Sequence, residues 1–134
     1  MVNYLAILVA AIASMIIGGL WYSPILFGKK WLKEMKIEKS DMPEMKKKAN
    51  KSYVIMFLSS LVMAYALSRF IILTNTTTLA AGLLIAFLAW LGFLATSLLG
   101  SVLWEGKSIS LYLINASNYL VTLLVMGAIL VSWP

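Results

Sequence analysis

The chain has 134 residues, of which 62% are hydrophobic and only 12% charged, and its mean hydropathy is +0.93. A soluble domain carries about a quarter charged residues and leaves much of its surface in water, so this composition excludes an ordinary water-soluble fold. Histidine and cysteine are absent, which excludes disulfides, cysteine nucleophiles and metal or triad chemistry built on these residues.

Four apolar runs are long enough to cross a bilayer. A span needs about 20 apolar residues to cover roughly 30 Å of hydrocarbon, and residues 4–22, 52–73, 79–104 and 109–133 each supply a run of this kind. Unpaired backbone groups are too costly in lipid for open strands, so each run must be helical. The sequence therefore predicts an all-α integral membrane protein, a four-transmembrane-helix bundle forming a single domain over residues 1–134.

The net charge of +6 is concentrated in one segment. Nine of the eleven basic residues and four of the five acidic ones lie between Lys29 and Lys51. Basic residues favour the cytoplasmic side, so we expect loop 29–51 inside, both termini outside, and a location in the cell membrane. Anionic lipid headgroups, rather than nucleic acid, are the expected partner of this loop. The candidate lipid contacts are Lys29, Lys30, Lys33, Lys46, Lys47, Lys48 and Lys51.

The charged loop divides into two pieces. Residues 27–36 place Trp31, Leu32 and Met35 on one helical face with lysines on the other, which is typical of a short helix in the membrane interface; a solvated loop is the alternative. Residues 40–44 contain capping candidates and a proline, which indicate a helix start. A helix begun there would continue into the second span without a break.

The end of the first span carries an aromatic corner. Pro24 disfavours helical geometry at the residue before it, so we expect the helix to end here. The corner is either a helix stop with aromatic anchors or the wall of a ligand or lipid groove. It comprises Trp21, Tyr22, Ser23, Pro24, Phe27 and Trp31.

This corner also carries a resemblance. Residues 18–31 contain W-Y-S-P-x-x-F-G-x-x-W, and residues 103–107 with Asn115 and Tyr119 add to it. The chain resembles an uncharacterised family of small four-span membrane proteins, a domain-of-unknown-function family, over essentially its whole length. The resemblance implies the architecture predicted above and no activity.

The fourth span is the most polar. Tyr112, Asn115, Tyr119 and Thr122 follow helical spacing, and Asn118 lies beside them. Buried polar side chains in lipid normally hydrogen-bond to neighbouring helices. These five residues therefore either hold helices together or line a polar path or ligand site.

Small residues recur at every fourth position in three spans, and such faces let membrane helices approach closely. We expect them to pack inside the bundle, with self-association into a homo-oligomer as their other use. The sets are Ala10, Ser14 and Gly18; Ser60, Ala64 and Ser68; and Gly92, Thr96 and Gly100.

Arg69 lies near the outer end of the second span, and Glu105 lies at the inner end of the third. About 26 helical residues, or roughly 40 Å, separate these two levels, so the two side chains cannot pair within one protomer. Arg69 is therefore a candidate contact for another anion, such as a lipid phosphate.

No catalytic, metal or cofactor motif is present, so we expect neither an enzyme nor a cofactor. Our first hypothesis is a self-associating transporter- or channel-like protein with a polar path along the fourth span. The spans hold no carboxylate of the kind that proton-coupled carriers use. The alternative is a scaffold, an accessory subunit or an anionic-lipid-binding module that acts through the basic loop.

Overall fold

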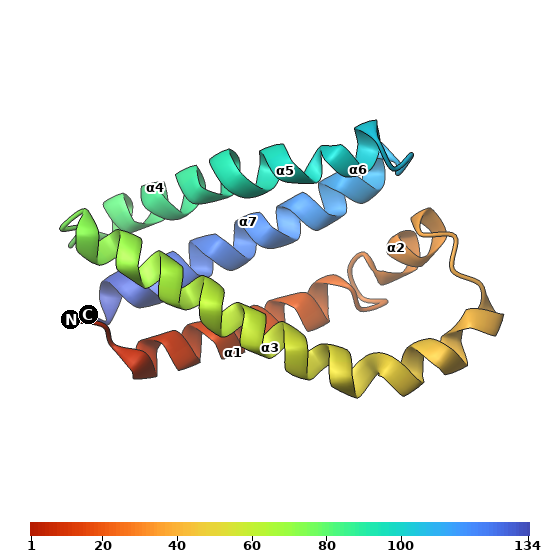
Figure 1. Cartoon of the computed structure of the whole chain (residues 1–134), viewed down its shortest axis with the longest axis horizontal. Helices are drawn as coiled ribbons and strands as arrows, with labels where there is room; N and C mark the ends of the chain where they lie inside the picture. Colours follow the sequence, from red (N-terminus) through yellow and green to blue (C-terminus); the bar gives the residue numbers. More distant parts are fainter.

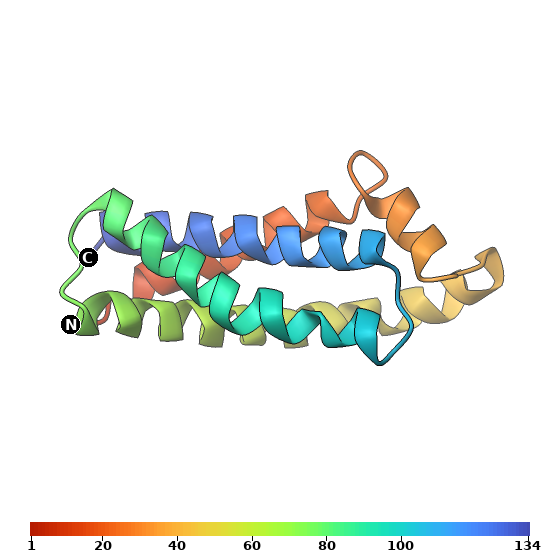
Figure 2. The same cartoon turned by 90° about the horizontal axis from the view of Figure 1, so that it is seen from above.

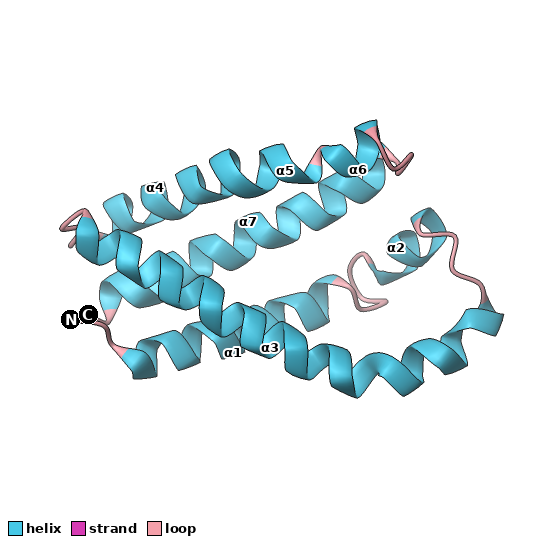
Figure 3. Ribbon diagram, viewed as in Figure 1, coloured by secondary structure: helices cyan, strands magenta, loops and turns pink.

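Helices are the only regular secondary structure in the computed structural model, which describes residues 1–134 (Figures 1 and 3). Two of the nine segments are not α-helical, since η1 is a 3₁₀ turn and η2 a π-helical turn. The segments are α1 (Tyr4–Trp21), α2 (Gly28–Glu34), η1 (Lys39–Asp41), α3 (Met42–Leu73), α4 (Leu79–Ala89), η2 (Trp90–Ala95), α5 (Thr96–Leu98), α6 (Gly100–Leu103) and α7 (Ile109–Ser132).

Four rods are long and apolar enough to cross a membrane, and they cover Tyr4–Trp21, Lys39–Leu73, Leu79–Leu103 and Ile109–Ser132. This confirms the predicted all-α, four-span fold. The 32 residues of α3 are about 48 Å long, more than the roughly 30 Å of hydrocarbon. Its basic first turns therefore extend past the hydrocarbon. The prediction that one helix begins at residues 40–44 and continues into the second span is confirmed.

The helix α7 is the centre of the arrangement. It packs against α1, α4 and α3. Half of the residues in its most apolar stretch are buried, whereas 28% or less are buried in the corresponding stretches of the other three rods. Figure 1 shows α7 between the α4–α6 rod and the helices α1 and α3, and Figure 2 shows the first turns of α3 extending beyond the end of α7. The buried core lies at the end of the molecule that holds the termini and includes Ala10, Leu67, Met126 and Leu130.

Small residues bring α4 and α7 together. A Cβ atom added to Gly127 would lie 3.0 Å from the Cβ of Ala86 and 3.1 Å from the carbonyl oxygen of Gly82. One added to Gly82 would lie 2.8 Å from Cγ1 of Val131. This pair of helices therefore depends on glycine at the crossing, which the sequence analysis did not single out.

The three predicted small-residue faces differ in outcome. Ser60, Ala64 and Ser68 are buried, as expected. A Cβ added to Gly18 or to Gly92 would meet no atom within 4 Å, and Thr96 is exposed. The expectation of packing inside the bundle is therefore wrong for the third span, because α7 contacts a different face of that rod. Self-association stays a prediction.

The short helix α2 has the predicted two-sided character. Trp31 and Leu32 are half-buried, whereas Lys29, Lys30 and Lys33 are exposed. The Ser108 hydroxyl, which caps the first turn of α7, also donates a hydrogen bond of 2.6 Å to Glu34 Oε2. The carboxylate therefore lies beside the positive end of the α7 dipole, an arrangement that is favourable for an anion.

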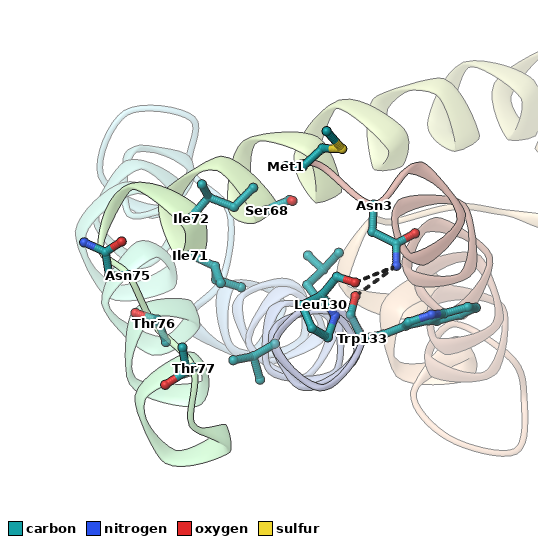
Figure 4. Close-up of a pocket in the computed structure, with 12 residues that line it drawn as sticks. Met1, Asn3, Ser68, Ile71, Ile72, Asn75, Thr76, Thr77, Leu130 and Trp133 are labelled. Carbon is teal, nitrogen blue, oxygen red and sulfur yellow. Dashed lines mark hydrogen bonds between the residues drawn. The ribbon is translucent and has the colours of Figure 1, made fainter.

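The two termini meet at the end opposite α2. Asn3 Nδ2 lies 3.2 Å from the carbonyl oxygens of both Trp133 and Pro134, to which it donates (Figure 4). The Asn3 side chain also accepts a hydrogen bond from Ala6 N and so caps α1. A hollow of about 210 Å³ lies beside this contact. Which side of the membrane this end faces stays a prediction.

Candidate functional site

A cavity of about 480 Å³ lies between α1, α3 and α7. Its volume falls in the range of small-molecule sites, about 300–1,000 Å³. Its walls are a mixture of hydroxyl, amide, thioether and aromatic groups. They come from Ser14, Met15, Gly18, Gly19, Tyr22, Tyr53, Met56, Ser59, Ser60, Met63, Asn118, Tyr119 and Thr122.

The cavity is closed toward the termini. On each of its three helices, the residue four positions beyond a lining residue in that direction is buried core. These residues are Ala10, Leu67 and Met126, which are 0%, 2% and 0% exposed. They form a packed floor on that side, beyond which no lining residue lies.

Asn118 is the polar group that the fold leaves unsatisfied. Its side chain lines the cavity and is 8% exposed. The amide oxygen, Oδ1, is buried and has no hydrogen-bond partner. A buried acceptor without a partner costs about 1–3 kcal/mol, so a hydrogen-bond donor that reached this amide oxygen would stabilise the protein.

The other polar groups of the cavity are uncharged. Ser14 Oγ and Ser60 Oγ lie 3.2 Å apart, and Ser60 also donates to the Met56 carbonyl oxygen at 2.9 Å. Tyr119 and Thr122 add two further hydroxyls from α7. No lysine, arginine, aspartate or glutamate is among the lining residues, and the cavity therefore offers hydrogen bonds without a counter-charge.

The aromatic corner fastens α1 onto α7. Trp21 Nε1 donates to the Ile114 carbonyl oxygen at 2.9 Å, and Tyr22 Oη donates to Asn115 Oδ1 at 2.7 Å. Tyr22 also lines the cavity. The corner was expected either to anchor the end of a helix or to form the wall of a groove. These two roles are compatible, because Tyr22 both anchors α1 to α7 and forms part of the cavity wall.

The turn after α1 is compact. The Ser23 hydroxyl donates to the Leu20 carbonyl oxygen at 2.7 Å, and Gly28 N donates to the Ser23 carbonyl oxygen at 2.8 Å. A Cβ at Gly28 would lie 2.7 Å from that same oxygen, so only glycine fits. The rings pack in two pairs, and Pro24 is exposed. The pairs are Trp21 with Phe27, whose centroids are 5.0 Å apart, and Tyr22 with Trp31, at 5.7 Å.

The predicted polar stripe of α7 divides in two. Asn118, Tyr119 and Thr122 line the cavity, whereas Asn115 is joined to Tyr22 and does not line it. Tyr112 Oη donates instead to the carbonyl oxygen of Ala95, at 2.7 Å. The stripe therefore contains both helix-joining residues and cavity residues.

The third span is joined to α7 at both ends of its π-helical turn, η2. Trp90 Nε1, at the first residue, donates to the Ala116 carbonyl oxygen at 2.7 Å. The Ala95 carbonyl oxygen, at the last, accepts from Tyr112. Such turns are rare and often lie near functional sites. The sequence analysis missed both Trp90 and this turn, although a tryptophan in mid-span was a visible signal.

The remaining predicted residues are at the surface. The candidate lipid contacts Lys46, Lys47, Lys48 and Lys51 are exposed on the first turns of α3, as the lysines of α2 are. Arg69 is exposed near the other end of α3. None of these side chains lines the cavity.

Four rods that are long and apolar enough to cross a membrane, three of which line the cavity, define a helical protein of the membrane-spanning class. The chain belongs to the family described as "Protein of unknown function (DUF1761)", whose model matches residues 5–131. This confirms the predicted membership of an uncharacterised family. No curated protein and no solved structure matches the chain.

The bond between Tyr22 and Asn115 can be measured by a double-mutant cycle with Tyr22→Phe and Asn115→Ala. We expect a coupling of about 0.5–1.5 kcal/mol in the free energy of unfolding in detergent, because hydrogen bonds between membrane helices have this size. The control cycle pairs Asn115→Ala with Tyr65→Phe, whose ring is exposed on α3, and should show no coupling. Equal values in the two cycles would contradict the contact.

Proposed function

We propose that this protein is a small membrane carrier that binds an uncharged molecule in the cavity between α1, α3 and α7. The observation that supports this most strongly is the cavity itself, whose lining includes several hydroxyl groups and the residue Asn118, whose buried amide oxygen has no partner. A protein that served only as a scaffold would have no use for an unsatisfied polar group within its spans, since such a group destabilises the fold.

The packed floor favours a carrier over a channel. A channel needs a continuous path, and Ala10, Leu67 and Met126 close the cavity toward the termini. A carrier works between two states, each open on one side, and the cavity has the shape of one such state. We further propose that the open end faces the cytoplasm, because it lies toward the loop with nine of the eleven basic residues.

The same observations support binding of a ligand without its chemical conversion. The polar groups of the cavity are hydroxyls and amides, and the lining residues include no carboxylate or amine. General acid–base catalysis near neutral pH relies most often on histidine, carboxylate or amine groups, and none of these lines the cavity. We therefore propose no enzymatic activity and no cofactor.

The cavity can be tested with a single introduced thiol, because the chain contains no cysteine. We expect N-ethylmaleimide to label Tyr119→Cys, at a half-buried position that lines the cavity, in lipid nanodiscs, since water enters the cavity and the reagent reacts with the thiolate. Met126→Cys, on the same helix but 0% exposed, is the matched control and should stay unlabelled. Equal protection of both thiols would show a dry interior and contradict the proposed function.

A second candidate function is binding of anionic lipid through the charged loop. It is favoured by the exposure of seven lysines on α2 and the first turns of α3, beside the half-buried Trp31 and Leu32. Each basic side chain near an anionic surface contributes about 1 kcal/mol. This function and the carrier function concern different surfaces, so each can fail without the other.

We expect Lys46→Gln, Lys47→Gln, Lys48→Gln and Lys51→Gln, combined in one variant, to weaken this lipid preference. The measurement is the melting temperature in nanodiscs of phosphatidylglycerol minus that in phosphatidylcholine, with and without added salt. The difference should fall by about half, since four of seven lysines lose their charge. The matched arginine variant keeps the charge and should keep the difference; an unchanged glutamine variant would reject this function.

A further inference from the structure

The cavity wall formed by α1 and α3 contains exposed residues. Four lining residues are exposed, namely Gly19 on α1 and Tyr53, Met56 and Ser59 on α3. A Cβ atom added to Gly18 or Gly19 would meet nothing within 4 Å. The missing side chains of the two glycines therefore leave a slot in the wall at this level of the two helices.

The slot lies along the spans and reaches below the interface. Tyr53 and Ser59 are six residues apart on α3, which corresponds to about 9 Å along a helix. Gly19 precedes the end of α1 by two residues. Tyrosine rings are favoured at headgroup level, and we place Tyr22 and Tyr53 there. The part of the slot that lies deeper in the membrane than these rings then faces hydrocarbon. A molecule dissolved in the bilayer can therefore reach the cavity directly.

The walls suit an apolar body. Met15, Met56 and Met63 are unbranched, polarizable side chains that adapt to irregular apolar shapes, and all three line the cavity. A charged group would find no counter-charge among the lining residues and would lose its hydration, which is costly at this depth.

The polar end of the ligand is indicated by Asn118. An amide offers both an acceptor oxygen and N–H donors, and a hydroxyl group can donate to the first and accept from the second. The Ser14 and Ser60 hydroxyls form a second pair of donor and acceptor groups in the same cavity. Asn118 lines the cavity, and a hydroxyl on an apolar ligand would bond to its amide, whose oxygen the fold leaves buried without a partner.

From these observations we infer that the ligand is an uncharged amphipathic molecule, an apolar body bearing a hydroxyl group, that enters from the bilayer through the slot between α1 and α3. This inference rests on the proposed binding function and specifies its ligand class. It also explains how the cavity works without a carboxylate or an amine, because a neutral lipid-soluble molecule needs neither a counter-charge nor a coupled proton.

The test uses three photoreactive probes with the same diazirine-bearing twelve-carbon chain, ending in a hydroxyl, a methyl or a carboxylate group. Each probe is added to the full chain in nanodiscs, and labelled peptides are mapped by mass spectrometry. We expect the alcohol to label the cavity segments of α1 and α3 about fivefold to tenfold more than the other two, the change produced by one hydrogen bond inside a protein.

Two variants locate the effect. Asn118→Leu removes the amide at similar volume and should abolish the preference for the alcohol, while the melting temperature confirms that the variant is folded. Gly19→Leu fills the slot, where the structure leaves room for a side chain, and should reduce labelling by the alcohol. Gly92→Leu, at another glycine with no atom within 4 Å, is the matched control and should label as the natural chain does.

The outcomes separate this inference from the function on which it rests. Equal cavity labelling by the alcohol and the methyl-ended probe would overturn hydroxyl recognition. Absence of alcohol labelling, combined with maleimide labelling of Tyr119→Cys, would leave a binding cavity that is filled from water and overturn the lipid route. Failure of both experiments would overturn the cavity and the inference together.

Discussion

Polar groups that enter hydrocarbon must find partners inside the protein, and this constraint organises the whole molecule. Lipid tails give apolar helices no reason to associate, so close packing and hydrogen bonds between helices must hold the rods together. Here α7 receives most of those contacts. Trp21 and Trp90 each donate to one of its backbone carbonyl oxygens, and Tyr22 donates to Asn115.

The same constraint makes the exceptions informative. Large apolar side chains such as Val62 and Phe93 are exposed because lipid is their solvent, so exposure of this kind carries no functional meaning here. A buried polar atom without a partner is different, since nothing in the bilayer compensates it. Asn118 Oδ1 is such an atom, and its residue lines a cavity of ligand size. The proposed binding function follows from this exception, because a ligand that hydrogen-bonds to Asn118 would supply the partner that the fold does not.

Much of the architecture was predictable because apolar runs of span length have one stable solution in a bilayer. The first span was predicted to end at residue 22 and α1 ends at Trp21; the continuous helix from the charged loop into the second span and the amphipathic α2 were also confirmed. In each case the deciding signal is local, since it consists of hydropathy, a proline or the spacing of lysines.

The site was predictable only in part, because it depends on how the helices rotate against one another. Tyr112 and Tyr119 are seven residues apart and share a helical face, yet Tyr112 bonds to Ala95 and Tyr119 lines the cavity. The π-helical turn changes the direction of side chains in the third span; Trp90 is visible in the sequence, but no residue type predicts the turn itself. The crossing at Gly82 and Gly127 likewise becomes visible only when the partner helix is placed.

The account rests on hydrocarbon as the solvent of the outer surface. The most direct measurement is the collision rate of spin labels at Val62→Cys and Phe93→Cys, side chains that are 69% and 68% exposed, with oxygen and with a polar nickel complex in nanodiscs. Because oxygen concentrates in hydrocarbon and the nickel complex stays in water, we predict that oxygen collisions dominate at both positions. Dominant collisions with the nickel complex would place these surfaces in water and contradict the account.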